Sequence, residues 1–229
     1  MNSDDLGSQV YKTLKERLIT CFYKPDSLLN EVQISQELGC SRTPTRQAII
    51  KLEKEGFLEV IPKKGIYVTG ITISEIMQVF QTRQIIEPIA LRLGWGNIDK
   101  TVIRNFKIQF EKTKEVIVDD YFVDAAFHMY IVELCGISFI IRMMHSVFDK
   151  NERITVSEKH NQGYENAIPE HLAIIDSILN DDCEKACALL VDHINNCRSL
   201  ALDSFTSTFD AKQPSFYKNY LENNCFNEE

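Results

Sequence analysis

The sequence predicts a mainly α protein in which a winged helix-turn-helix domain precedes an all-α helical bundle. Two short capped helical patterns and a β-hairpin pattern follow one another within residues 30–69. From residue 74 onward, apolar residues recur at helical spacing with almost no strand or turn signal. The predicted divisions are a first domain over 1–70, a linker over 71–73, a helical domain over 74–208 and a tail over 209–229.

Three helices are predicted in the first domain, over residues 8–21, 30–39 and 41–56. Val10, Leu14 and Leu18 recur every four residues and give the first helix one apolar face. Asn30 is the expected N-cap of the second helix, and Gly39 is expected to end it. Two short helices joined by a tight turn are typical of a helix-turn-helix.

The third helix opens with two arginines on one face. Ser41 or Thr43 is expected to cap it, and Pro44 suits its first turn, where a missing N–H costs little. Arg42 and Arg46 lie four residues apart, and an arginine can donate two hydrogen bonds to guanine O6 and N7. A solvated charged face is the alternative interpretation. The order of caps, proline, preceding helix and following hairpin favours DNA contact.

A β-hairpin is predicted directly after the third helix. The turn PKKG separates two β-rich stretches, FLEVI and IYVT. This is where a winged helix carries its wing. Lys63 and Lys64 at the tip are therefore expected to meet DNA phosphates.

Six helices are predicted in the second domain, over 74–95, 99–117, 119–135, 137–156, 168–180 and 182–206. The polar segment over 157–169 contains Gly163 and ends in a proline, so it is predicted to be a loop. The turn NDD around Asp181 is predicted to join the last two helices as an antiparallel hairpin.

Four polar residues of the second domain are predicted to share one site. Asp124 and His128 lie four residues apart on one helix face. His171 lies ten residues before Asp181 and His193 twelve after it, so the hairpin places both imidazoles about 15–18 Å from the turn. One carboxylate and three imidazoles suit Zn²⁺ or Ni²⁺. The residues alone fit a second interpretation equally well, in which Asp124 and His128 form a hydrogen bond on a helix surface and the other histidines lie in the core.

Composition limits the class of protein. The chain has 229 residues and a net charge of −8, but residues 1–70 hold 10 Lys and Arg against 9 Asp and Glu. The acidic excess therefore belongs to the second domain, and a local basic surface remains available for phosphates. No run of 18 apolar residues and no apolar signal core occur, so we expect a cytoplasmic protein without a membrane span. The seven cysteines are interpreted as reduced thiols.

Residues 10–69 resemble the DNA-binding domain of GntR-family transcriptional regulators. The resemblance rests on the stretch LLNEVQISQELGCSRTPTRQAIIKLEKEGFLEVIPKKGIYV, which contains a recognition segment of the SRTPVREAL type. It implies DNA contacts by Arg42, Thr43 and Arg46 and by the wing glycine Gly65. Thr45 stands where valine or leucine is usual and joins the predicted set. The predicted DNA-binding residues are Arg42, Thr43, Thr45, Arg46, Lys63, Lys64 and Gly65.

The second domain resembles the FCD ligand-binding domain of the FadR subfamily. Members carry a D-x3-H pair, a histidine at a helix start, and another histidine 22 residues later. The metal ligands that this implies are Asp124, His128, His171 and His193. The resemblance also implies that Arg83 binds a carboxylate effector, although a salt bridge to Glu87 would explain Arg83 as well.

The resemblance as a whole implies a homodimeric repressor. It would bind a palindromic operator in double-stranded DNA. It would release the operator when a small carboxylate completes the coordination sphere of a divalent metal. Two alternatives remain: a metal-dependent hydrolase-like enzyme with Glu170 as base, and a direct metal sensor. The sequence contains no nucleophile motif, phosphate loop or HExxH, which disfavours the enzyme.

Overall fold

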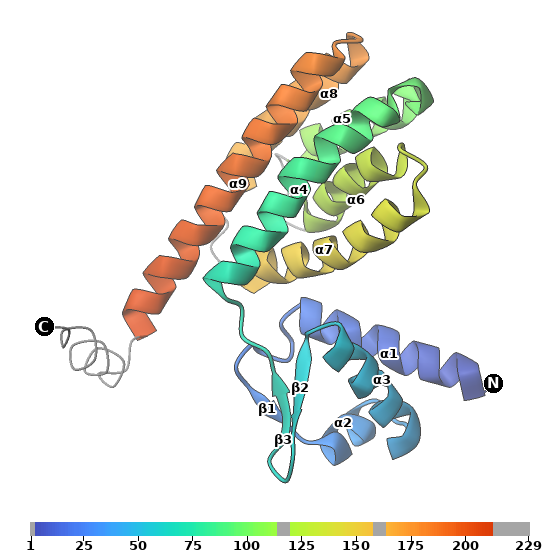
Figure 1. Ribbon diagram of the computed structural model, residues 1–229, viewed down its shortest axis with the longest axis vertical. Coiled ribbons are helices and arrows are strands. Elements are labelled where there is room, and N and C mark those ends of the chain that lie inside the picture. The colour runs from blue at the N-terminus through green and yellow to red at the C-terminus, as the bar shows by residue number, and fades with distance from the viewer. Residues whose placement is uncertain (1–2, 114–119, 158–163, 213–229) are drawn as a thin grey trace, which may run out of the picture.

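A winged helix-turn-helix and a helical bundle make up the computed structural model, which describes residues 3–113, 120–157 and 164–212 (Figure 1). The mainly α fold class predicted from the sequence is confirmed. The first unit comprises α1 (Ser3–Ile19), β1 (Leu28–Leu29), α2 (Glu31–Glu37), α3 (Arg42–Lys54), β2 (Leu58–Ile61) and β3 (Gly65–Val68). The bundle comprises α4 (Ile73–Leu93), a short 3-10 helix (Trp95–Asn97), α5 (Lys100–Thr113), α6 (Asp120–Glu133), α7 (Ser138–Ser157), α8 (Tyr164–Leu179) and α9 (Cys183–Lys212).

The helix-turn-helix forms because α1 and α3 bury their apolar faces against each other. The predicted stripe of α1 is fully buried, and Ala48, Ile49 and Leu52 face it from α3. Asn30 caps α2, with its side chain accepting a hydrogen bond from the amide of Val32. Ser41 is the N-cap of α3, as expected, but its side chain makes no capping hydrogen bond. Packing on α1 therefore stabilises α3 more than capping does.

The wing belongs to a three-stranded antiparallel sheet of order β1-β3-β2. The two-residue strand β1 is too short to leave a sequence pattern and was not predicted. The turn between β2 and β3 closes with the amide of Lys64 donating to the carbonyl of Ile61, and Lys63 adopts a left-handed φ of 64°. Gly65 has φ 134°, and a Cβ there would lie 2.7 Å from the carbonyl oxygen of Leu29. Glycine is thus required for β1 to pair with β3.

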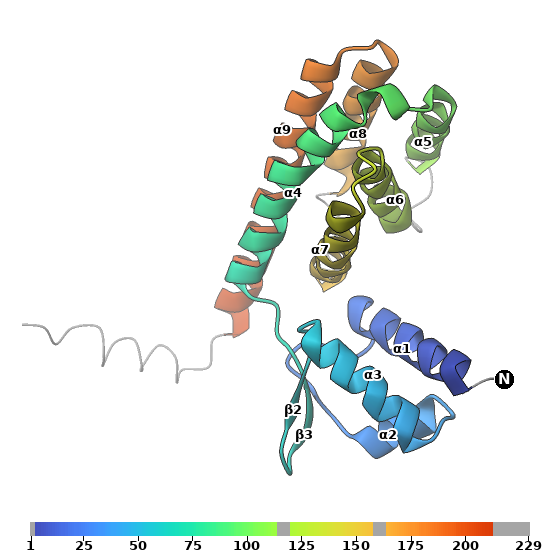
Figure 2. The same ribbon diagram turned by 45° about the vertical axis from the view of Figure 1, so that its right-hand side comes forward.

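The bundle surrounds one large apolar core. Helix α4 packs along α9 and against α7, while α8 and α9 form an antiparallel hairpin (Figures 1 and 2). The core residues with no exposed surface include Ile76, Leu91, Ile103, Phe127, Ile131, Ile174, Ile175, Leu190 and Ile194. Within the described residues, no helix combines the length and the apolarity needed to cross a bilayer.

Two predicted boundaries of the bundle are wrong. Helix α8 begins at Tyr164, so residues 164–169 are helical rather than part of a loop; 158–163 lie outside the described residues. Ala167 and Ile168 are buried there, and their packing compensates for the hydrogen bond that Pro169 cannot donate inside the helix. Helix α9 continues to Lys212, six residues beyond its predicted end.

Candidate functional site

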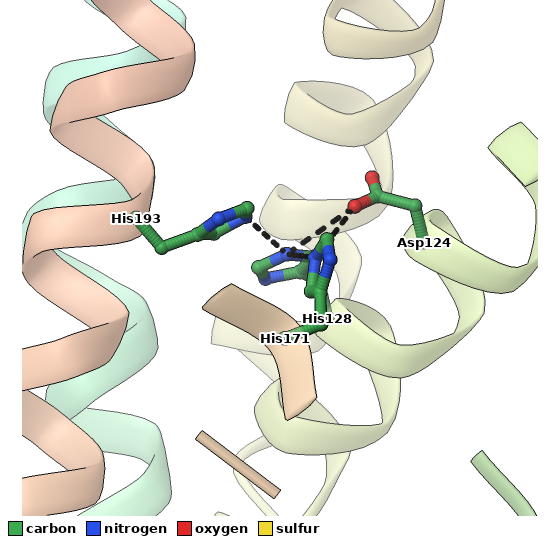
Figure 3. A group of neighbouring side chains, drawn as sticks. All are labelled: Asp124, His128, His171 and His193. Carbon is green, nitrogen blue, oxygen red and sulfur yellow. Dashed lines mark hydrogen bonds and ion pairs between the residues drawn. The ribbon is translucent and has the colours of Figure 1, made fainter. Parts of the chain in front are cut away.

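Four side chains from three helices of the bundle converge on one point (Figure 3). Asp124 and His128 come from α6, His171 from α8 and His193 from α9. The Nε2 atom of His128 lies 3.3 Å from Nε2 of His171 and 3.2 Å from Nε2 of His193. Asp124 Oδ1 lies 2.9 Å from His171 Nε2 and 3.6 Å from His128 Nε2. One ligand atom from each residue lies within 4.8 Å of the other three.

The local sequence explains this convergence. One helical turn separates the two residues from α6, so both point from the same face. Asp181 adopts a left-handed φ of 59° in the turn between α8 and α9, and the Asp182 side chain accepts from the amide of Lys185 at the start of α9. The hairpin predicted from NDD is therefore present, and it brings His171 level with His193.

Two further carboxylates, neither of which is among the predicted metal ligands, orient two of the imidazoles. Glu87 Oε2 lies 2.5 Å from His128 Nδ1, and Glu170 Oε2 lies 2.8 Å from His193 Nδ1. Each carboxylate faces Nδ1 of its ring and directs Nε2 of that ring into the site. The two Nε2 atoms lie 3.2 Å apart. A ring that carries its only proton on Nδ1 presents an Nε2 lone pair there, which is the form that binds a metal ion.

Burial sets the charge state of the cluster. Desolvation, followed by the nearby imidazole of His171, lowers the pKa of His193 to about 3 although Glu170 opposes the shift. Burial likewise lowers the pKa of His171 despite its contact with Asp124. Burial alone would raise the pKa of Asp124, but the facing imidazoles and Arg83 outweigh it and hold that pKa well below its ordinary value. At neutral pH, His171 and His193 are therefore neutral and Asp124 is ionised.

The residues present fit a small divalent cation. Ligand atoms about 2.1 Å from an ion lie about 3.0–3.4 Å from one another in octahedral or tetrahedral shells. The four distances given above, from 2.9 to 3.6 Å, are close to this range. Imidazole nitrogen and carboxylate oxygen are donors that suit Zn²⁺ and Ni²⁺. The three histidines are at most 1% exposed, whereas the Asp124 side chain is 16% exposed. A ligand from solvent would therefore reach the cluster past Asp124.

Arg83 is buried beside this cluster. Its Nε donates to Glu87 Oε1 (2.8 Å) and its Nη1 donates to Asn151 Oδ1 (2.8 Å). Its Nη2 is buried and has no partner among the described residues. Burial would lower the pKa of Arg83, but Glu87 raises it, so the guanidinium stays charged. The predicted salt bridge to Glu87 is present, and one donor remains available to another group.

The predicted DNA-binding residues lie on the first unit, away from the bundle. Arg42, Thr43 and Arg46 are exposed at the start of α3. Lys63 and Lys64 are exposed at the β2–β3 turn, which forms the end of the molecule opposite the bundle (Figure 1). The structure thus leaves five of the predicted side chains, all cationic or hydroxyl-bearing, on the accessible surface of α3 and of the β2–β3 turn.

Thr45 is the exception, and its predicted DNA contact is withdrawn. The side chain has no exposed surface. Its hydroxyl lies 3.1 Å from Ser35 Oγ and from Cys40 Sγ, and it donates to the carbonyl of Ser41 at 3.1 Å. Thr45 therefore stabilises the packing of α2 on α3, where a β-branched apolar residue would also fit.

Two protein families match the two units of the chain. Residues 6–68 match "Bacterial regulatory proteins, gntR family", and residues 78–196, more than half of the chain, match the FCD domain.

Bacterial transcriptional regulators and a solved structure are similar to this chain over about half of its length or more. The HTH-type transcriptional repressor RspR of Escherichia coli (strain K12) is 23% identical over 195 residues, 82% of this chain and 86% of RspR. YdhC of Bacillus subtilis (strain 168), an uncharacterized HTH-type transcriptional regulator, is 29% identical over 109 residues, 48% of this chain and 49% of YdhC. The solved structure of E. coli McbR/YncC shares the fold with a TM-score of 0.74, at 18% identity, over 90% of this chain and 100% of that one.

Proposed function

The chain belongs to the FCD-domain regulators of the bacterial gntR family, and we propose that it is a homodimeric repressor controlled by a small carboxylate at a divalent metal. It is a DNA-binding transcriptional regulator and not an enzyme. The observation that supports the metal is the convergence of three imidazole nitrogens and one carboxylate oxygen. The Nε2 atoms of His128 and His193 lie 3.2 Å apart, and a carboxylate faces Nδ1 of each of these rings.

In this proposal Asp124, His128, His171 and His193 hold the ion, Zn²⁺ or Ni²⁺. When bound, the metal supplies a Lewis-acidic centre for an oxygen of the effector. Arg83 adds the second anchor, because its free Nη2 can donate to a carboxylate without releasing Glu87 or Asn151. The site therefore suits a small organic acid with at least one carboxylate.

Mass spectrometry of purified protein tests this proposal. Native spectra should show one metal ion per chain together with a small acid, and adding that acid should release operator DNA. Metal bound without any acid effect, and operator affinity that follows metal concentration alone, would instead indicate a direct metal sensor. Protein that binds neither metal nor acid would contradict the proposal.

DNA binding is expected to weaken steeply as salt rises. The exposed cations Arg42, Arg46, Lys63 and Lys64 would displace counterions from phosphates, so the logarithm of affinity should fall linearly with the logarithm of salt concentration. Fluorescence anisotropy with a duplex selected from a random-sequence library measures the slope. A flat response would contradict phosphate contact by this surface.

A second copy of the chain is the proposed partner of an exposed apolar face on the bundle. Ile85, Ile89 and Leu93 recur every four residues on α4 and are all exposed. Phe139 (78% exposed) and Met143 lie one turn apart on α7, which packs against α4. Exposed apolar patches of this kind mark association surfaces. A two-fold dimer would present two recognition helices to two operator half-sites.

Replacing Ile89 with glutamate should convert this dimer into a monomer. The substitution places a charge in the apolar stripe, and a charge buried without a partner opposes association. Light scattering coupled to size exclusion measures the mass of the particle. Ile108→Glu on α5, where the isoleucine is 47% exposed, is the matched control and should remain dimeric. A dimeric Ile89→Glu protein would reject this face.

A further inference from the structure

A continuous set of buried contacts leaves the candidate metal centre in the direction of the first unit. It begins at His128, whose Nδ1 bonds to one oxygen of Glu87 (2.5 Å). The other oxygen of Glu87 accepts from Arg83 Nε (2.8 Å), and Arg83 Nη1 donates to Asn151 on α7 (2.8 Å). All four side chains are at most 5% exposed, so water does not compete for these hydrogen bonds. Helix α7 is therefore hydrogen-bonded to the guanidinium that is held by the same carboxylate that orients a candidate metal ligand.

The same segment of α7 holds the winged helix-turn-helix. Arg153 has no exposed surface, and its Nη1 donates to Thr69 Oγ1 (3.2 Å) while its Nη2 donates to the Thr69 carbonyl. Lys150 Nζ donates to the carbonyl of Gly56 (2.9 Å), two residues beyond the end of α3, and pairs with Glu75 Oε1 (2.9 Å). Thus α7 contacts Thr69, directly after the wing, and Gly56, two residues before it.

We propose that Asn151 is the positioning residue through which occupancy of the metal site reaches the DNA-binding unit. The inference rests on the proposed function of that site. Asn151 lies one residue after Lys150 and two before Arg153, so a displacement of Arg83 moves all three along one rigid helix. A ligand that prefers one position of Arg83 would therefore also prefer one position of the winged helix.

A purely structural role for Asn151 gives a different expectation. In that case Asn151 would only satisfy the Arg83 guanidinium, and its loss would lower stability equally with and without metal. The coupling role predicts instead that its loss removes the response of the first unit to metal. The difference between the metal-bound and metal-free protein thus separates the two roles.

Hydrogen–deuterium exchange of the full chain, with Zn²⁺ alone as the probe, measures this difference. In the wild type, Zn²⁺ should slow exchange over residues 56–72 by about twofold or more. In Asn151→Ala, Zn²⁺ affinity measured by chelator competition should be retained, while the change over 56–72 disappears. Asn151→Asp keeps an oxygen at the Oδ1 position and should restore the change. Asn105→Ala, at an exposed position of α5, is the matched control and should behave as wild type.

Each remaining outcome contradicts a defined part of the inference. If Zn²⁺ slows exchange over residues 56–72 in Asn151→Ala as much as in the wild type, the proposed role of Asn151 is overturned. Zn²⁺ binding to the wild type without any change over residues 56–72 overturns the coupling and leaves the metal centre intact. A wild type that does not bind Zn²⁺ overturns the proposed metal centre, and the coupling with it. If Asn151→Ala does not fold, Arg153→Met repeats the test at the α7 residue that contacts Thr69. This variant should still bind Zn²⁺, but Zn²⁺ should no longer slow exchange over residues 56–72.

Discussion

His193→Ala protein is expected to lose stoichiometric metal while remaining folded. The substitution removes one of three nitrogen ligands and leaves Glu170 without its imidazole partner. Loss of one ligand from a four-residue site should lower metal affinity by at least about 100-fold, since even the loss of an outer hydrogen-bond partner costs about 10–100-fold. Elemental analysis of the purified variant, with circular dichroism to monitor folding, provides the measurement.

His145→Ala is the matched control for this substitution. His145 is an exposed histidine of α7 outside the cluster, so its loss should leave metal content unchanged. Undiminished metal in His193→Ala would reject the ligand role of His193. Equal losses in both variants would indicate metal adsorbed at the surface.

Arg46→Ala is expected to weaken operator binding by about tenfold or more without affecting the fold. Arg46 is exposed on the first turns of α3, where a guanidinium that bonds guanine contributes about 1–3 kcal/mol of discrimination. The substitution should also relax base preference at one position of the operator. Anisotropy titrations with the selected duplex and with single-base variants of it measure both effects.

Arg104→Ala controls for the loss of one positive charge. Arg104 is exposed on α5 in the bundle, so operator affinity should not change. If Arg46→Ala binds the selected duplex as tightly as wild type, the proposed contact of Arg46 with guanine is wrong.

The sequence predicted the fold well where periodicity and spacing carry the information. The stripe of Val10, Leu14 and Leu18 became the buried face of α1. The spacing of Asp124 and His128 placed one pair of site residues on a single face, and the turn at Asp181 placed His171 level with His193; the meeting of the two pairs was implied by the family resemblance. Both predictions depend on distances along a helix, which sequence determines directly.

Other features depended on contacts between distant segments, which periodicity does not encode. Thr45 lies between two arginines that are predicted to face DNA, but the packing of α2 on α3 buries its side chain. Glu87 was visible only as a partner of Arg83 four residues earlier. Its second contact is with His128, which lies 41 residues later and on another helix, α6. Asn151 likewise carries no local signal, because its partner Arg83 is 68 residues away.

The proposed regulation requires one ion bound through nitrogen and oxygen atoms of Asp124, His128, His171 and His193. X-ray absorption at the K-edge of the metal in Zn²⁺- or Ni²⁺-loaded protein measures these ligands directly. The predicted spectrum shows a first shell of light atoms about 2.0–2.1 Å from the metal, with the multiple scattering of imidazole rings. A shell that contains sulfur, or one without imidazole scattering, would contradict the assignment of the site.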